Sequence, residues 1–243
     1  MVKGISRCLA VLLLVFAAAT GRAATSTLGF SSLPSAQGWT YDGPHVGEAE
    51  VFSVGAGTLT LNTMGLGYYD WAQYELFNFL APQLPFSIEI TARVLGQYHF
   101  NPAQDSMQGA LTFGAITATR QGQTDSFTVV DIGENFINTH WDNIAFDNSV
   151  FHTFKLSVSP VDGTFSLFVD GTSLSSGCAC MGSGGVSKVF FGDPGWSVNG
   201  NVEIQRIEVI QQPVPEPEIH AMLLAGLGLL GFIARRRKKP LAA

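Results

Sequence analysis

Basic residues are scarce in the middle of this chain. Between residues 25 and 213 there are only five lysines and arginines against seventeen aspartates and glutamates, so this segment has a formal charge near −12. A nucleic-acid-binding protein needs a basic face that neutralises phosphates. The composition therefore excludes DNA and RNA as partners. The whole-chain charge of −6 is less negative because the two ends hold most of the basic residues.

Helical patterns are also lacking in this middle segment. It contains no amphipathic heptads, tandem repeats or low-complexity tracts, whereas glycine and phenylalanine are frequent, with 27 and 18 in the whole chain. Such a composition suits short strands joined by tight turns. The roughly 190 residues are enough for one domain with a full hydrophobic core.

Alternation of apolar and polar residues predicts strands at 152–159 and 164–169. Asp162-Gly163 between them favours a hairpin turn, because glycine accepts the positive φ that the turn requires, and Asp170-Gly171 indicates a second turn. A bulge is expected at Gln205-Arg206, where the alternation slips. The other predicted strands are 58–63, 86–94, 110–117, 126–131, 188–192 and 202–210. Short strands without helical runs between them favour an all-β sandwich.

The first 24 residues have the pattern of a secretory signal peptide. Lys3 and Arg7 precede an apolar run over 9–19, and the small residues Ala23 and Ala24 offer a site for signal peptidase. The run is too short to span a bilayer as a helix, which needs about 20 residues. A buried first helix is the alternative interpretation.

The C-terminus shows three ordered features: a Pro-Glu-Pro motif, an apolar run over 219–234 and a basic cluster. The motif comprises Val214, Pro215, Glu216, Pro217 and Glu218, and the cluster comprises Arg235, Arg236, Arg237, Lys238 and Lys239. The run would be about 24 Å long as a helix, which predicts a single transmembrane helix whose basic end stays in the cytoplasm. The prolines hold the motif extended, a form that can enter a protease cleft.

This tail closely resembles the PEP-CTERM sorting tail. The resemblance implies that an exosortase, a membrane transpeptidase-like enzyme, cleaves near the motif and releases or transfers the domain. It also implies a Gram-negative bacterium that makes extracellular polysaccharide, a transient stage in the inner membrane, and a final place at the cell surface or in the biofilm matrix. A plain single-pass anchor is the alternative. The predicted parts are a signal peptide at 1–24, a domain at 25–212 and a sorting tail at 213–239.

A second resemblance concerns the domain between these ends. Its motifs occur in the order Gly38-Trp39, Gly57-Thr58-Leu59, 86–90, 152–171 and Phe191-Gly192-Asp193. In that order they look like the concanavalin A-like (laminin G-like) superfamily, which implies a concanavalin A-like jelly-roll β-sandwich. This fold occurs in lectins, glucanases and passive adhesion modules, so it does not choose among these functions.

Catalytic patterns are missing. Glycoside hydrolysis uses two carboxylates about 5 to 10 Å apart, and the Glu-x-Asp-x-x-Glu strand of the superfamily's glucanases does not occur here. Glu203 and Glu208 are five residues apart and fall on opposite faces unless the bulge resets the alternation. Asp131 and Glu134 flank Gly133 in an expected loop. We expect no enzymatic activity; a polysaccharide-modifying enzyme with an unrecognised site is the alternative.

Two stretches combine aromatic and polar residues in the way that sugar sites do. Sugars present apolar C–H faces rimmed by hydroxyl groups, so they bind aromatic rings beside short polar side chains. The candidate contacts for an exopolysaccharide are Tyr69, Trp71, His140 and Trp141. Core or rim aromatics without a ligand, in a passive matrix component, are the alternative.

The chain offers no specific metal motif. Clustered oxygen ligands favour calcium, and the second aromatic stretch and its surroundings supply Asp142, Asn143, Asp147 and Asn148. Their spacing matches no known loop motif, so we assign no metal site and keep calcium as a possible cofactor.

Cys178 and Cys180 are candidates for a local disulfide in an oxidising compartment, although bridging residues i and i+2 is strained. Free or intermolecularly paired thiols and a metal site are the alternatives.

Overall fold

The computed structural model describes residues 23–81, 84–100, 108–117, 126–139, 141–179, 187–193, 195, 197–212 and 226–227. One compact unit comprises Ala23–Gln212. The predicted signal peptide, apart from Ala23 and Ala24, and the sorting motif lie outside the described residues. Of the predicted membrane helix, only residues 226–227 are described, and these are helical. Within the described part of the chain, no helix is long and apolar enough to cross a membrane.

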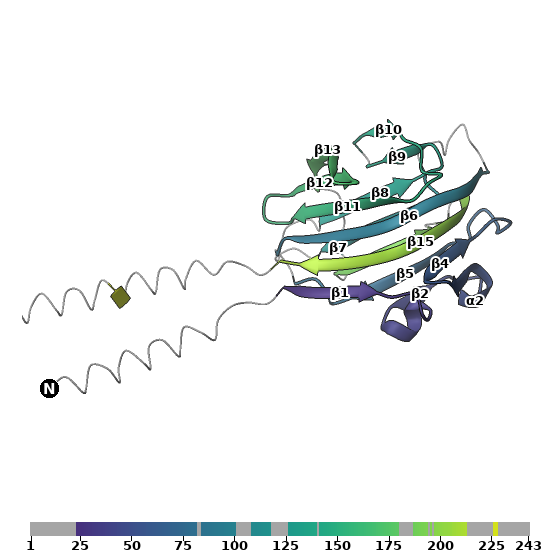
Figure 1. The fold of residues 1–243 in the computed structure, drawn as a ribbon, viewed down its shortest axis with the longest axis horizontal. Helices are drawn as coiled ribbons and strands as arrows, with labels where there is room; N and C mark the ends of the chain where they lie inside the picture. The colour runs from purple at the N-terminus through teal and green to yellow at the C-terminus, as the bar shows by residue number, and fades with distance from the viewer. Residues whose placement is uncertain are drawn as a thin grey trace, which may run out of the picture. The chain divides into compact units, whose positions relative to one another are not determined.

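Two antiparallel sheets form this unit (Figure 1). The eight-stranded sheet has the order β13-β12-β11-β6-β15-β4-β3, with β1 paired to β15. Its strands are β1 (Ala24–Leu28), β3 (Phe52–Gly55), β4 (Thr58–Asn62), β6 (Phe86–His99), β11 (His152–Ser159), β12 (Thr164–Val169), β13 (Thr172–Cys178) and β15 (Val198–Gln211).

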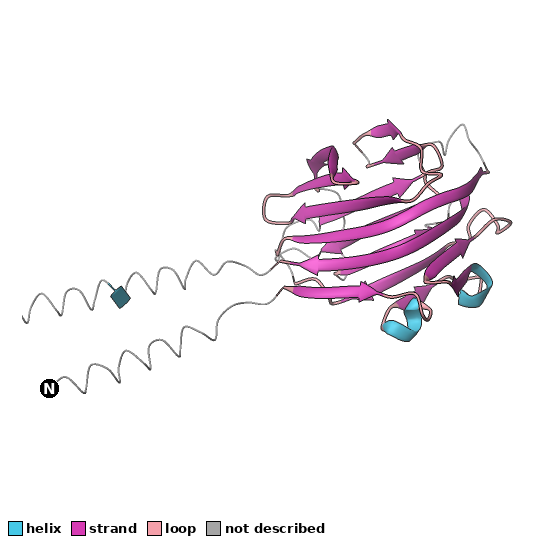
Figure 2. Ribbon diagram, in the orientation of Figure 1, coloured by secondary structure: helices cyan, strands magenta, loops and turns pink. Residues whose placement is uncertain are grey.

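The seven-stranded sheet has the order β10-β9-β8-β7-β14-β5-β2. Its strands are β2 (Thr40–Asp42), β5 (Ala72–Phe77), β7 (Leu111–Thr117), β8 (Ser126–Ile132), β9 (Phe136–Asn138), β10 (Asn143–Ala145) and β14 (Lys188–Asp193). Two short helical segments, η1 (Pro34–Gln37) and α2 (Glu48–Val51), lie in connections (Figure 2). The predicted all-β sandwich is therefore confirmed.

The core lies between the sheets because one face of each strand is apolar. In β11, Phe154, Leu156 and Val158 are buried and the residues between them are polar. The core aromatics include Tyr74 and Phe191, whose ring centres are 5.4 Å apart. The other face of each sheet remains available for polar side chains and for binding.

The predicted hairpin is confirmed, with β11 and β12 at the predicted bounds. Gly163 has a φ of 62°, and Asp170 and Gly171 have φ values of 49° and 80°. Both turns therefore use the left-handed backbone that their Asp-Gly sequences favour.

The two long strands extend beyond their predicted bounds. Strand β6 continues past the predicted end at residue 94 to His99, and β15 begins at Val198, four residues before the predicted start. They pair along thirteen residues, and the predicted bulge is confirmed as a register shift between Ile204 and Arg206. The extensions, residues 95–99 and 198–201, consist mostly of glycine and polar residues, so they lack the alternation of apolar and polar residues that predicts a strand. Strands β1, β2, β3, β9, β10 and β13 were not predicted because they are short or polar. Strand β5 was also missed, although Ala72, Tyr74 and Leu76 alternate with polar residues along it.

Candidate functional site

The outer face of the seven-stranded sheet contains a groove. Along β7, Phe113 and Ala115 lie in the core, so Thr112 and Ile116 occupy the opposite face. A cavity of about 540 Å³ opens on this face, lined by residues of β2, β5, β14, β7, β8 and β9. Two further lining residues, Phe165 of β12 and Cys178 of β13, belong to the eight-stranded sheet. A cavity of this size is within the range of small-ligand sites.

A row of polar residues crosses the sheet perpendicular to its strands. Cross-strand pairing places these residues side by side in the order Asp42, Gln73, Gly192, Thr112, Asp131 and Asn138. We call these six residues the polar row. All of them except Gly192 line the cavity. Five strand spacings of about 4.8 Å make the row about 24 Å long, so it suits an extended polar ligand.

Asp131 has the most perturbed carboxylate of the groove. Its Oδ1 accepts a hydrogen bond from Thr112 Oγ1 at 2.5 Å. Burial raises the pKa of Asp131 to about 7, although the hydrogen bond from Thr112 acts in the opposite direction. None of the described basic side chains forms an ion pair with it. Near neutral pH, Asp131 therefore exists in both its protonated and its ionised form, and each form can hydrogen-bond to a hydroxyl group.

A second set of contacts links the polar row to the neighbouring row of side chains. Gln73 Nε2 donates to Asp42 Oδ2 at 3.1 Å and to Glu75 Oε1 at 3.0 Å. The ammonium group of Lys188 forms an ion pair with Glu75 and lies 5.9 Å from the centre of the Phe77 ring. The one basic residue that lines the described part of the cavity is therefore already neutralised.

Two tryptophans flank the groove at its opposite ends. Trp71 precedes β5 and Trp141 follows β9, and both line the cavity. Strands β5 and β9 are separated by four strand spacings, about 19 Å. The indole of Trp141 is 52% exposed, and its Nε1 donates to the backbone oxygen of Cys178 at 2.9 Å. The part of the polar row from Gln73 to Asn138 thus spans the strands between the two tryptophans, and Asp42 lies one strand beyond, on β2.

The other two predicted sugar contacts have different positions. Tyr69 does not line the cavity; it is 64% exposed and packs edge-on against Tyr68, with ring centres 4.6 Å apart. Tyr68 in turn contacts Phe100. The loop is fixed by Asp70, whose pKa is lowered by the Gly67 backbone N–H and by His45. His140 lies outside the described residues.

The rim beside Trp141 includes a disulfide cysteine. Cys178 is disulfide-bonded and lines the cavity. The other two cysteines of the chain, Cys8 and Cys180, lie outside the described residues, so the pairing of Cys178 with Cys180 stays a prediction. A Cβ atom on neighbouring Gly177 would lie 3.1 Å from the Trp141 ring, so the indole packs closely on the β13 backbone.

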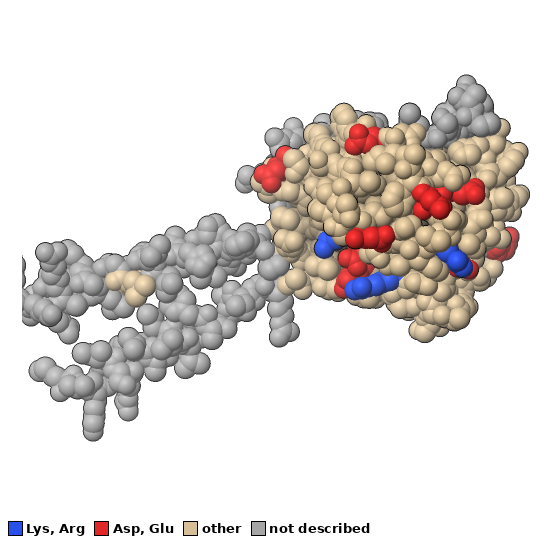
Figure 3. All heavy atoms as spheres, turned by 45° about the horizontal axis from the view of Figure 1, so that its top comes forward, with Lys and Arg blue, Asp and Glu red and all other residues tan. Residues whose placement is uncertain are grey.

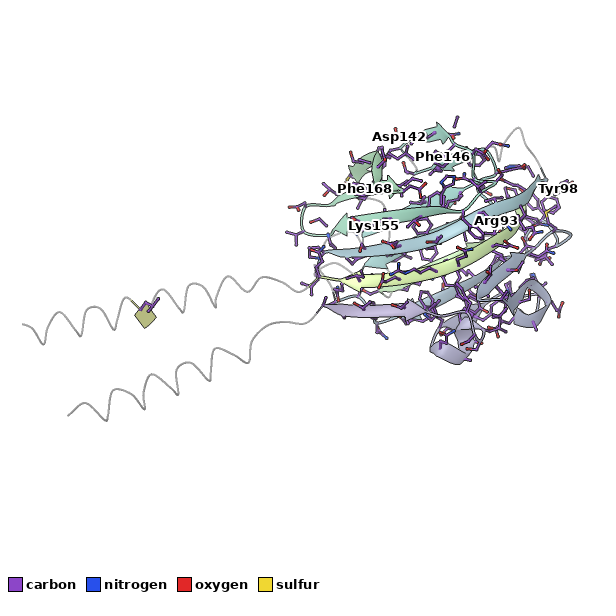
Figure 4. All side chains as sticks on the ribbon, in the orientation of Figure 1. Arg93, Tyr98, Asp142, Phe146, Lys155 and Phe168 are labelled. Atoms are coloured by element: carbon purple, nitrogen blue, oxygen red, sulfur yellow. The ribbon has the colours of Figure 1, made fainter. Side chains whose placement is uncertain are left out.

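The candidate calcium ligands serve as structural contacts. Ser175 Oγ donates to Asp142 Oδ2 at 2.5 Å, and Asp147 Oδ1 accepts from the Ser149 N–H. Asn148 is fully buried and donates to the backbone oxygens of Gly133 and Phe136. Asp142 and Phe146, near β9 and β10, are labelled in Figure 4. Among the described residues, no three His, Cys, Asp or Glu side chains form a metal-binding group.

The carboxylates of the described chain do not form an obvious hydrolytic pair. Asp131 lies on strand β8, as the predicted strand 126–131 requires, and not in the loop expected around Gly133, because β8 continues to Ile132 and pairs with β7 and β9. Glu203 and Glu208 share the outer face of the eight-stranded sheet because the bulge resets the alternation. They lie opposite Arg93 and Glu89, four residues apart on β6, which corresponds to about 13 Å.

Gly192 keeps the floor of the groove flat. Its φ is 145°, and a Cβ atom there would lie 2.4 Å from the backbone oxygen of Ala72 on β5. We expect Gly192→Ala to lower the free energy of unfolding by about 3 kcal/mol, because strain and overlap add. Urea unfolding measures this loss. Gly55→Ala, where a Cβ meets nothing within 4 Å, is the control, and equal effects of both variants would contradict the prediction.

Comparison with known proteins starts with the C-terminus. Residues 213–238 match the PEP-CTERM protein-sorting motif. The chain carries a PEP-CTERM sorting tail. The tail indicates export and sorting to the cell surface, with processing by an exosortase. The match covers the predicted Pro-Glu-Pro motif, the apolar run and most of the basic cluster. No curated protein sequence matches the chain.

Solved structures resemble the domain in fold. A carbohydrate esterase from the Shiga toxin-encoding bacteriophage phi24B is 16% identical, with a TM-score of 0.51 over 78% of this chain and all of that chain. A protein of unknown function from Shewanella oneidensis MR-1 is 13% identical, with a TM-score of 0.50 over 82% and 92%. Lectin I-B4 from Griffonia simplicifolia is 12% identical, with a TM-score of 0.49 over 78% and 100%. Such low identities show the fold alone, a β-sandwich.

Proposed function

We propose that this protein is a non-enzymatic component of the cell surface or extracellular matrix and binds exopolysaccharide in the groove of its seven-stranded sheet. The sorting tail would deliver it there. The observation that supports binding is the polar row together with the two tryptophans, Trp71 and Trp141, that line the same cavity. Hydroxyl, amide and carboxyl groups in one line can pair with the hydroxyl groups of successive sugars, while the indoles offer apolar faces for C–H groups.

The dimensions of the groove favour a chain over a single sugar. The polar row is about 24 Å long, because five strand spacings separate its ends. Both ends of the row lie on edge-side strands, β2 and β9, with only β10 beyond β9. The proposed ligand therefore lies across the strands and makes contacts with several sugar units.

A polysaccharide-modifying enzyme is the second candidate, and Asp131 is the observation that favours it. A carboxyl group with a pKa of about 7 can act as a general acid near neutral pH. The carboxylate of Glu75 on the groove face lies on β5, the third strand from β8 and beyond Lys188 on β14. Three strand spacings are about 14 Å, which is beyond the separation of a glycosidase pair. Release of reducing sugar or of acyl groups from polysaccharides would establish catalysis.

Replacing Trp141 with alanine tests the proposed binding site. We expect the variant to bind its polysaccharide at least about tenfold more weakly, because burying one large apolar side chain contributes about 1.5 to 3 kcal/mol. Binding of the purified full-length protein to an immobilised polysaccharide panel measures the affinity, and circular dichroism checks that the variant is folded.

Tyr98→Ala is the matched control for this test. Tyr98 is 52% exposed, as Trp141 is, but it contacts Phe100 and does not line the cavity. We expect its loss to leave binding unchanged. If Trp141→Ala binds as well as the wild-type protein, or if both variants weaken binding equally, the groove is not the binding site.

A further inference from the structure

The groove has an unusual balance of charge. Its described lining contains two carboxylates of the polar row, Asp42 and Asp131, and one basic residue, Lys188. Lys188 is paired with Glu75, whereas Asp42 accepts its described side-chain hydrogen bond from a neutral amide, that of Gln73. Asp131 is held by the hydroxyl of Thr112. Asp42, together with Asp131 in its ionised form, therefore gives the described groove a negative charge that no basic side chain of the lining offsets.

The remaining basic residues of the described domain lie elsewhere. Arg93 and Lys155 are on β6 and β11 of the eight-stranded sheet, where Figure 4 labels them. Arg93 pairs with Glu203, and Arg206 contacts Glu89 and Glu208 on the same outer face. Figure 3 shows basic side chains beside acidic ones on this surface. These ion pairs lie on the eight-stranded sheet, so they do not neutralise the carboxylates of the groove.

An acidic polymer would meet an electrostatic penalty in such a groove. Its carboxylates would approach Asp42 and Asp131, and partial burial weakens the screening by salt. A neutral sugar chain meets no such penalty, because its hydroxyl groups can donate to the carboxylates. They can also donate to the hydroxyl oxygen of Thr112 and to the amide oxygen of Gln73, whose own hydrogens are already engaged by Asp131, Asp42 and Glu75. An amino group on the sugar would add attraction to the carboxylates.

We infer that the groove selects its glycan by charge: it binds chains without acidic groups, with or without free amino groups, and it excludes polyuronates. This inference rests on the proposed function of the groove. It extends that function, because the fold and the sorting tail by themselves are equally compatible with acidic and neutral polysaccharides.

Three oligosaccharides of equal length test the inference on the purified full-length protein: a neutral β-glucan, a chitosan and an alginate fragment. At low ionic strength we expect the alginate fragment to bind at least about tenfold more weakly than the β-glucan fragment, and the chitosan fragment to bind at least as tightly as the β-glucan. The difference should shrink in about 1 M salt, where the Debye length is about 3 Å.

Charge-neutral variants locate the effect. Asp42→Asn combined with Asp131→Asn should reduce the ratio of the alginate and β-glucan dissociation constants at least about threefold. Asp162→Asn is the isosteric control; Asp162 lies in the β11–β12 turn, where its Oδ2 accepts from Ser159, and its loss should leave the ratio unchanged. Equal binding of alginate and β-glucan at low salt, or an unchanged ratio in the double variant, overturns the inference alone. Absence of binding by all three oligosaccharides overturns the proposed function itself.

Discussion

Raising the pH from 5 to 8 is expected to destabilise the domain, by about 2 to 3 kcal/mol through Asp193 alone. Asp193 is fully buried at the end of β14. Thr63 Oγ1 donates to its Oδ2, and the Gly195 N–H donates to its Oδ1 at 2.8 Å. Burial raises the pKa of Asp193 to about 7, against the lowering effect of these two hydrogen bonds.

The sign of the pH effect follows from this raised pKa. An aspartate in the unfolded chain has a pKa near 3.8, so between about pH 4 and pH 7 the folded state binds more protons than the unfolded state. Stability then falls as the pH rises through this window and levels off above 7. Asp131, with a pKa also raised to about 7, adds to the same trend. Chemical unfolding at a series of pH values measures it.

Asp193→Asn separates the contribution of Asp193 from all others. The amide oxygen can still accept from the Gly195 N–H. The amide NH₂ can donate to Thr63 Oγ1, and the Thr63 hydroxyl can donate to the backbone oxygen of Gly200, 3.3 Å away, so the local contacts can be kept. We expect the variant to lose about half of the pH-dependent destabilisation, with the rest due to Asp131. A wild-type protein that is more stable at pH 8 than at pH 5 would refute the prediction. So would a variant whose stability changes with pH as the wild type does.

The second large effect concerns the sorting tail. Replacing Pro215, Glu216 and Pro217 with alanine is expected to leave the whole population unprocessed, because the matched motif at 213–238 would lose its recognition element. Without the prolines, the segment also gains access to helical conformations. Immunoblots of membrane and extracellular fractions in a bacterium with an exosortase measure the ratio of full-length to shortened protein.

A neighbouring substitution controls for nonspecific effects on export. Gln212 directly precedes the matched segment, and its backbone N–H donates to the backbone oxygen of Pro85. Because Gln212→Ala keeps this backbone contact and the motif, we expect the variant to be processed like the wild-type protein. Shortened, surface-delivered protein from the triple-alanine variant would show that the motif does not direct sorting.

Local sequence patterns were sufficient to predict the all-β fold and the longer strands of this protein. Alternation in 152–169 determines two strands and their turn, because each apolar residue of that segment faces one core. A second local pattern, aromatic residues beside short polar ones, identified Trp71 and Trp141 as candidate sugar contacts, and both line the cavity. Tyr69 has the same local composition, but it lies outside the cavity lining.

The polar row could not have been found in this way. Its six residues come from six strands, and only the pairing register brings them together. Asp131 is an example. The sequence predicted a strand that ends at this residue and a loop around Gly133, but it did not reveal that β8 is bordered by β7 and β9 on its two sides. Burial of that carboxylate by its neighbours, which raises its pKa, is likewise a property of tertiary structure and not of the local sequence.

Strand β15 leads directly to the segment that matches the sorting motif. If that end is attached to a surface, tension on the protein enters the domain through β15. This strand is bonded to β6 over thirteen residues on one side, and to β1 and β4 on the other. A pull along its axis must shear many hydrogen bonds at once, so the tethered end is mechanically strong. The groove lies on the other sheet, outside this line of force.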